Sequence, residues 1–285
     1  MESKSEMRFK MDMVKMLPFF PNTKETKEEL LGQSICSILF HYIHWAARFI
    51  PSRSRKIIID PYVTRDSRWK KLKPAIEKLF VKVRNGEDLS PYLSLKVQKK
   101  GYTPSERVRN GEVDSWEDKD RLLNTMGFHH LHLGEVITDD IAERTDDVIF
   151  VRVSREMFHV IAIFNHSVFD DNIDTDGSMN SERSRLLGIY QEFSARGMPH
   201  DSPYVSNPIT ASGHPLHVHD ITFEYIHVIE QLDHKIMDNE FQNSIYNETG
   251  LKKPNNNKLK WHINGLDLGL LDKDNQFFIL RHGYS

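Results

Sequence analysis

Hydrophobic residues recur at helical or strand intervals along the first third of the chain. From residue 28 to residue 49 apolar side chains return every three or four positions, which predicts an amphipathic helix. Residues 55–63 (RKIIIDPYV) are short and rich in β-branched side chains, so they predict a strand. Residues 67–84 predict a second helix, and the Asn-Gly pair that follows is a typical helix stop.

The pattern becomes strand-like in the middle of the chain. Residues 128–133 (FHHLHL) alternate between apolar and polar positions, which predicts a strand. Two apolar runs, 147–153 and 157–164, are separated by three residues and predict a hairpin. Further helices are predicted over 182–196 and 221–237. A terminal hairpin is predicted from strands at 259–263 and 276–280.

These elements predict an α+β protein in which a small antiparallel sheet is flanked by helices. We expect three consecutive regions. Residues 1–54 form an N-terminal arm and amphipathic helix, 55–170 an α+β unit of catalytic type, and 171–285 an acidic helical and β-hairpin region. A length of 285 residues accommodates about two units at ~150 residues each.

Composition narrows the classes of protein to consider. The single cysteine, Cys36, excludes a disulfide scaffold and a paired-cysteine metal site. No stretch is apolar enough to predict a membrane span, and the charged N-terminus lacks a signal core, so a cytoplasmic protein is expected. Glycine-rich nucleotide loops and the GxSxG motif are absent, and no cofactor is predicted.

Charge is distributed unevenly along the chain. Residues 1–120 contain 24 Lys and Arg against 17 Asp and Glu, whereas residues 121–285 contain 14 against 24. A basic segment interleaved with aromatic residues is typical of single-stranded RNA binding. The alternative is that these cations solvate helix surfaces or pair with the acidic half. The candidate RNA-binding cations are Arg48, Arg53, Arg55, Lys56, Arg65, Arg68, Lys70, Lys71 and Lys73.

Histidines supply the candidate chemistry. Side chains alternate along a strand, so His130 and His132 are expected on one face and His129 on the other. His166 follows the last strand of the hairpin and can lie on the same sheet face as His132. Two histidines beside a basic surface suit RNA cleavage without a metal, because histidine can serve as base or acid near neutral pH. His129 or His130 would support the pair.

The stretch 127–170 resembles the catalytic half of the RelE/YafQ family of toxin endoribonucleases. Gly127-Phe128 leads to a strand with His132, the two apolar runs match the family's hairpin, and residues 165–169 (NHSVF) match its terminal segment. The upstream order of strand, helix and helix also agrees. The resemblance implies a RelE-like core, catalytic His132 and His166, and a Phe169 that positions a base. It also implies an RNA substrate, commonly ribosome-associated messenger, and no metal.

The sequence departs from the family at one catalytic position. Val136 stands where the family has an aspartate, and the family's Gly-Thr pair before the last histidine is Phe164-Asn165 here. Four aspartates of the following loop are alternative replacements, and the sequence does not choose among them. They are Asp139, Asp140, Asp146 and Asp147.

The sequence is also consistent with three other hypotheses of function. His217 and His219 are one residue apart in an expected loop, and such a pair can ligate a metal in a metal-dependent nuclease or hydrolase. The chain can instead be a nucleic-acid-binding protein without catalysis, its histidines being ordinary strand-edge residues. In a toxin or phage-defence effector, the acidic C-terminal half would act as a built-in inhibitor, or a separate antitoxin would bind the basic surface.

Overall fold

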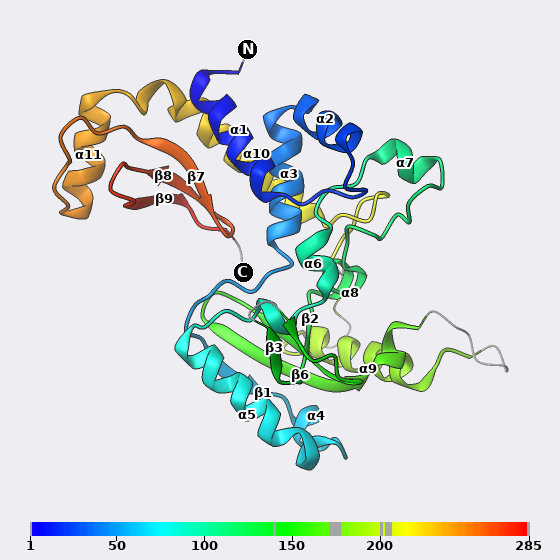
Figure 1. Ribbon diagram of the computed structural model, residues 1–285. Coiled ribbons are helices and arrows are strands. Elements are labelled where there is room, and N and C mark those ends of the chain that lie inside the picture. Colours follow the sequence, from blue (N-terminus) through cyan, green and yellow to red (C-terminus); the bar gives the residue numbers. More distant parts are fainter. Residues whose placement is uncertain (1, 139–140, 171–177, 200–201, 203–206, 284–285) are drawn as a thin grey trace. The chain divides into compact units, whose positions relative to one another are not determined.

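The computed structural model describes residues 2–138, 141–170, 178–199, 202 and 207–283 (Figure 1). The fold is α+β with small, mainly antiparallel sheets flanked by helices, which confirms the predicted class. The chain forms two compact units that differ from the three consecutive regions expected from the sequence. Unit 1 contains Met1–Arg48, Lys96–Lys119 and Ala211–Ser285, and unit 2 contains Phe49–Leu95 and Asp120–Thr210. Each unit joins segments that are distant in sequence.

Unit 1 is built from helices and a C-terminal sheet. Its helices are α1 (Lys4–Met16), α2 (Lys24–Gly32), α3 (Ile35–Ala46), α7 (Ser105–Arg109), α10 (Leu216–Leu232) and α11 (Asn239–Thr249), with a 3-10 turn η3 (Asp233–Lys235). The short helix α6 (Leu95–Lys99) begins at the boundary with unit 2. The strands of unit 1 are β7 (Lys260–Asn264), β8 (Asp267–Leu271) and β9 (Phe277–Arg281), in that order in the sheet.

The N-terminal and C-terminal segments of unit 1 share one hydrophobic core. Helices α1, α3 and α10 pack together, and α1 also packs on β7. Tyr225 of α10 and Trp261 of β7 are buried in this core, and the Tyr225 hydroxyl donates to the Leu266 carbonyl at 2.5 Å. The C-terminal segment is therefore part of the unit that the first helices begin.

Helix boundaries in unit 1 differ from the predicted ones. The helix predicted over 28–49 is two helices, α2 and α3, because the chain is extended at Gln33 and Ser34. The Ser34 side chain accepts a hydrogen bond from Ser37 N and so caps α3. The predicted N-terminal arm contains α1. No helix in the described part of the chain combines the length and apolarity that a membrane span requires.

Unit 2 is organised around a four-stranded sheet. Its helices are α4 (Pro61–Thr64), α5 (Trp69–Asn85), α8 (Arg121–Met126) and α9 (Ser181–Ala195), with 3-10 turns η1 (Ser90–Tyr92) and η2 (His166–Phe169). The sheet strands are β1 (Lys56–Ile59), β2 (His129–His132), β5 (Asp147–Val153) and β6 (Met157–Asn165). A two-stranded ribbon joins β3 (Val136–Thr138) to β4 (Ile141–Ala142) where the sequence suggested only a loop.

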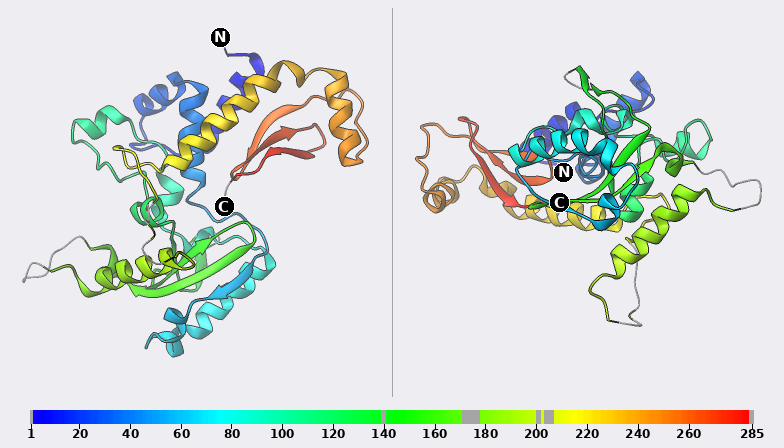
Figure 2. Two further views of the ribbon diagram at one scale, coloured as in Figure 1. Left: turned by 180° about the vertical axis from the view of Figure 1, so that it is seen from behind. Right: turned by 90° about the horizontal axis from the view of Figure 1, so that it is seen from below.

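The sheet of unit 2 has the strand order β1-β6-β5-β2. The β5–β6 hairpin is antiparallel, as predicted, and β2 is antiparallel to β5, whereas β1 is parallel to β6. Helix α9 packs on one face, where Leu186 and Ile189 meet Phe128, Phe150 and Phe164. Helix α5 lies on the other face (Figure 2). The candidate catalytic histidines of β2 lie on the face under α9.

Candidate active site

The structure brings His130, His132 and His166 together at one end of the sheet of unit 2. The ring centroids of His132 and His166 lie 5.2 Å apart, and those of His130 and His132 lie 6.3 Å apart. His130 and His132 share a face because the β2 strand alternates. His166 reaches them because β6 is paired with β5, which is paired with β2.

Turn η2 positions His166 and Phe169. The Asn165 side chain accepts hydrogen bonds from Ser167 N at 3.0 Å and from Ser167 Oγ at 2.6 Å, and so caps the turn. Asn180, at the start of α9, donates to the Ser167 carbonyl at 2.9 Å. The Phe169 ring then lies 4.8 Å from the His130 ring and 5.2 Å from the His166 ring. Phe169 is thus an aromatic wall of the histidine cluster.

His132 is held as a neutral ring. Its side chain is buried, and burial together with the nearby charge of Arg144 lowers its pKa to about 4. Nδ1 lies 3.3 Å from the Thr145 carbonyl oxygen, which can only accept, so we assign the ring proton to Nδ1. The Nε2 lone pair is then available to take a proton. His166, in contrast, is exposed to solvent.

Arg144 is a site residue that sequence reasoning missed. Its charge lowers the pKa of both His130 and His132, which places it beside them. Nη1 donates to the Leu93 carbonyl at 2.7 Å, while Nη2 is buried and makes no hydrogen bond to any described residue. The signal was available, because Arg144 is the one cation in the acidic stretch 134–146.

Asp120 places a carboxylate beside the cluster. Its Oδ2 lies 3.8 Å from His130 Nδ1, and its Oδ1 accepts from Leu123 N at 3.0 Å. The side chain therefore caps α8 and also faces His130. Helix α8 begins at Arg121, directly after this cap.

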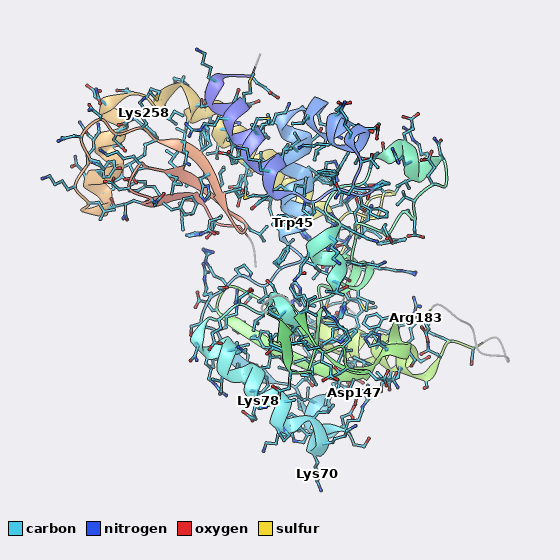
Figure 3. The ribbon with its side chains drawn as sticks, viewed as in Figure 1. Trp45, Lys70, Lys78, Asp147, Arg183 and Lys258 are labelled. Carbon is cyan, nitrogen blue, oxygen red and sulfur yellow. The ribbon has the colours of Figure 1, made fainter. Side chains whose placement is uncertain are left out.

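Of the four expected aspartates, the structure describes Asp146 and Asp147. Asp139 and Asp140 lie outside the described residues, and Asp146 is exposed. Asp147 is at the start of β5, with its Oδ1 3.8 Å from Arg68 Nη1 (Figure 3).

An ion-pair cluster supports the end of β6 directly before His166. Arg68 makes two hydrogen bonds to Asp66 and one to Glu182, and Glu182 accepts from Asn165 N at 3.1 Å. Arg185 also pairs with Glu182. The charge of the Arg68 guanidinium is thus offset by carboxylates, and its contact with RNA stays a prediction.

Two other predicted RNA-binding cations are buried. Arg48 donates to the carbonyls of Lys100 and Asp118, and Arg55 donates to three carbonyls, of Pro51, Arg53 and Ser154. Both guanidiniums are buried and donate to backbone oxygens, so they connect segments of the chain. The prediction that Arg48 and Arg55 contact RNA is therefore corrected. Arg53 is half-buried. Figure 3 shows the Lys70 side chain directed away from helix α5. The remaining predicted cations are exposed on or near β1, α4 and α5, and they are Lys56, Arg65, Lys70, Lys71 and Lys73.

Three further histidines, His129 of unit 2 and His217 and His219 of unit 1, were candidate site residues. His129 lies on the opposite face of β2, so it does not join the catalytic group that was predicted to include it. His217 and His219 lie in α10 rather than in a loop, and residues two apart on a helix point to nearly opposite sides. They cannot ligate one ion together. Among the described residues, no group of three His, Cys, Asp or Glu side chains is placed to hold a metal.

Compared with protein-family models, with curated proteins and with solved structures, the chain matches none. Functional inference therefore depends on the residues and geometry of the chain itself.

Proposed function

We propose that the protein is a metal-independent endoribonuclease, with its active site at the end of the unit 2 sheet. The observation that carries the proposal is the pairing of a buried neutral His132 with an exposed His166 at 5.2 Å between ring centroids. Arg144 supplies a cation and Phe169 an aromatic wall beside them. These are the groups that RNA cleavage through a 2′,3′-cyclic phosphate requires.

In the proposed reaction His132 is the base. Its Nε2 takes the proton of a ribose 2′-hydroxyl, and the 2′-oxygen then attacks the adjacent phosphorus. A phosphate bound at Arg144 offsets the positive charge that helps to lower the pKa of His132. Substrate binding therefore makes His132 a stronger base at the moment when it is needed.

His166 is the acid in this proposal. It gives a proton to the leaving 5′-oxygen and, being exposed, exchanges that proton with solvent. The positive charge of the Arg144 guanidinium would stabilise the phosphate oxygens as negative charge develops on them. The products are a 2′,3′-cyclic phosphate and a 5′-hydroxyl.

The charge of unit 2 supports RNA as the substrate. The exposed cations Lys56, Arg65, Lys70, Lys71 and Lys73, at β1, α4 and the start of α5, provide sequence-independent attraction for a polyanion. The chain order of β1, α5, α8 and then β2, β5 and β6 also agrees with the order noted for RelE/YafQ-like toxins. We therefore propose a toxin-type or phage-defence effector whose substrate includes ribosome-associated messenger.

The test is cleavage of end-labelled RNA in EDTA, alone and with translating ribosomes. We expect cyclic-phosphate products from the wild-type protein and loss of about 10²–10⁴-fold in rate for His132→Ala and for His166→Ala. His234→Ala is the matched control, because His234 is an exposed histidine of unit 1.

Circular dichroism of each variant separates lost chemistry from lost folding. Cleavage that disappears in EDTA and returns with a divalent metal would replace this mechanism with a metal-dependent one. RNA binding without any cleavage by the folded wild-type protein would support a binding module instead.

A further inference from the structure

Unit 2 contains a cavity at α9 that does not include the clustered histidines. It has a volume of about 480 Å³ and is lined by side chains from α8, β5, β6 and α9, with Asn207 beside them. Phe193 and Tyr190 provide its aromatic walls, and Arg152, His159 and Arg196 provide its nitrogen donors. We call it the Phe193 pocket.

The Phe193 pocket carries a net positive charge. Arg152 is exposed, its guanidinium carbon lies 5.6 Å from the centroid of the Phe193 ring, and it forms no ion pair with any described residue. Arg196 lies 5.3 Å from the same centroid and is paired with the buried carboxylate of Asp60. Burial lowers the pKa of His159, whose Nε2 lies 3.6 Å from Asp60 Oδ2. One guanidinium charge therefore remains without a counterion among the described residues.

The pocket shares a sheet face with the proposed active site. Phe193 contacts His159 at 5.4 Å and Phe128 at 5.7 Å between ring centroids, and Phe128 belongs to the face that carries His130 and His132. Val148 pairs with His132, and Arg152 is four residues further along β5, or ~13 Å at the rise of a strand. Helix α9 buries Phe128 and Phe150 between the two positions, so a single strand of RNA that reaches both passes around α9.

We propose that the Phe193 pocket is a nucleotide subsite for single-stranded RNA. Arg152 pairs with a phosphate, and a base enters the pocket to stack against the guanidinium planes and aromatic rings, a mode that single-stranded RNA recognition commonly uses. The subsite rests on the proposed function, because it would bind a nucleotide at a fixed distance from the phosphodiester bond that is cleaved. It would therefore help to select which bond of the RNA is cleaved.

Binding is tested without cleavage, using fluorescein-labelled RNA with 2′-fluoro sugars, which lack the attacking hydroxyl. Fluorescence anisotropy compares the wild-type protein with Arg152→Ala and Arg84→Ala over a range of salt concentrations. Arg84 is a matched control, because it is also exposed and its guanidinium carbon lies 5.9 Å from the Phe80 ring centroid on α5. We expect Arg152→Ala to weaken binding about tenfold and to reduce the salt slope by about 0.7. Arg84→Ala should leave both unchanged.

A second measurement places the base. An RNA series in which one nucleotide at a time lacks its base should show a loss of affinity at one position for the wild-type protein and for Arg84→Ala. In Arg152→Ala that loss should shrink, because two groups in one subsite are energetically coupled. Retention of the full loss, or equal affinities of Arg152→Ala and wild type, would overturn the subsite.

The two proposals fail differently. If RNA binds with the Arg152 dependence described above but unmodified RNA is not cleaved, the subsite stands and the catalytic proposal falls. If unmodified RNA is cleaved and Arg152→Ala binds like Arg84→Ala, the catalytic proposal stands and the subsite falls. Competition by free adenosine monophosphate at concentrations that displace the RNA would replace the RNA subsite with a site for a free nucleotide.

Discussion

Each unit of the protein contains a cluster of histidines, and the two clusters differ in what surrounds them. In unit 1, the ring centroids of His44 and His214 lie 4.6 Å apart, and those of His41 and Tyr102 lie 4.8 Å apart. Burial lowers the pKa of His41 to about 4 and that of His214 to about 3. In unit 2, burial lowers the pKa of His132 to about 4. The pKa shifts alone do not distinguish the clusters.

Access and partners do distinguish them. The unit 2 cluster has an exposed histidine, His166, a carboxylate at 3.8 Å from His130 and a neighbouring arginine. The unit 1 cluster packs against Phe40 and Tyr102 in the hydrophobic core. A lowered histidine pKa marks a functional site only where a substrate can reach the ring. We therefore expect the unit 1 cluster to govern stability and the unit 2 cluster to govern cleavage.

The largest expected effect is on catalysis. Arg144→Ala should lower the single-turnover cleavage rate about 10²–10³-fold, because it removes the positive charge that stabilises the developing phosphate charge. Arg144→Lys should recover part of that loss, since it restores the charge without the planar pair of donors. Arg84→Ala is the control. A rate for Arg144→Ala within twofold of wild type would remove Arg144 from the site.

The second effect is acid destabilisation of unit 1. Unfolded histidines titrate near 6.5, whereas His41 titrates at about 4 in the folded protein. The unfolded chain therefore binds more protons between these values, and the free energy of unfolding should fall as pH decreases from 6.5 to about 4. The loss is on the order of 3 kcal/mol for His41.

Tryptophan fluorescence can report this effect for unit 1 alone. Of the four tryptophans only Trp69 lies in unit 2, so Trp69→Phe leaves Trp45, Trp116 and Trp261 as probes. Urea unfolding of this variant at several pH values gives the slope, and adding His41→Gln should make it shallower. An unchanged slope would show that His41 does not control the acid response.

The third effect separates the clusters directly. A phosphate bound at Arg144 should raise the pKa of His132 by about 1 unit or more, because it brings an opposite charge near the ring. The pKa of His41 should not move. NMR titration of ring carbon signals, with and without a 2′-fluoro RNA, measures both values. Equal shifts in the two histidines would indicate a general change in the protein rather than binding at the proposed site.

Sequence reasoning found the histidine cluster because its evidence is local. Alternation in FHHLHL assigns His130 and His132 to one face, and the hairpin carries His166 back beside them. Arg144 and Asp120 were missed because they approach the histidines through the β3–β4 ribbon and the start of α8. Those contacts depend on tertiary packing, which the spacing of apolar and polar residues along the sequence does not predict.

The same distinction explains the errors in the fold. Strand β8 was missed because Gly269 weakens its strand pattern, yet a Cβ there would come within 2.1 Å of the Phe278 carbonyl oxygen. The close approach of β9 to β8 therefore requires glycine at position 269, the same residue that weakens the strand pattern in the sequence. The pairing of the first helices with the last 75 residues of unit 1 likewise has no local signal. For that reason, deleting the acidic C-terminal half would break the core of unit 1 rather than release an inhibitor.

The smallest expected effect concerns Asp120, which caps α8 and faces His130. Asp120→Ala should cost about 1 kcal/mol of stability, as loss of an N-cap usually does. Asp120→Asn should keep most of the cap, because asparagine is an equally good capping residue, but remove the charge that raises the pKa of His130. The pKa of His130 should then fall further below its usual value, and cleavage should slow while stability stays near wild type.

Unit 1 offers the matched comparison. Asp238 caps α11 and accepts a hydrogen bond from Glu240 N at 2.9 Å. Asp238→Ala should cost a similar ~1 kcal/mol and leave the cleavage rate unchanged. Thermal unfolding and single-turnover cleavage of Asp120→Ala, Asp120→Asn and Asp238→Ala then assign the two roles of Asp120. If Asp120→Asn cleaves RNA at the wild-type rate, Asp120 is a helix cap alone, and the unit 2 cluster works through its histidines and Arg144 without a carboxylate.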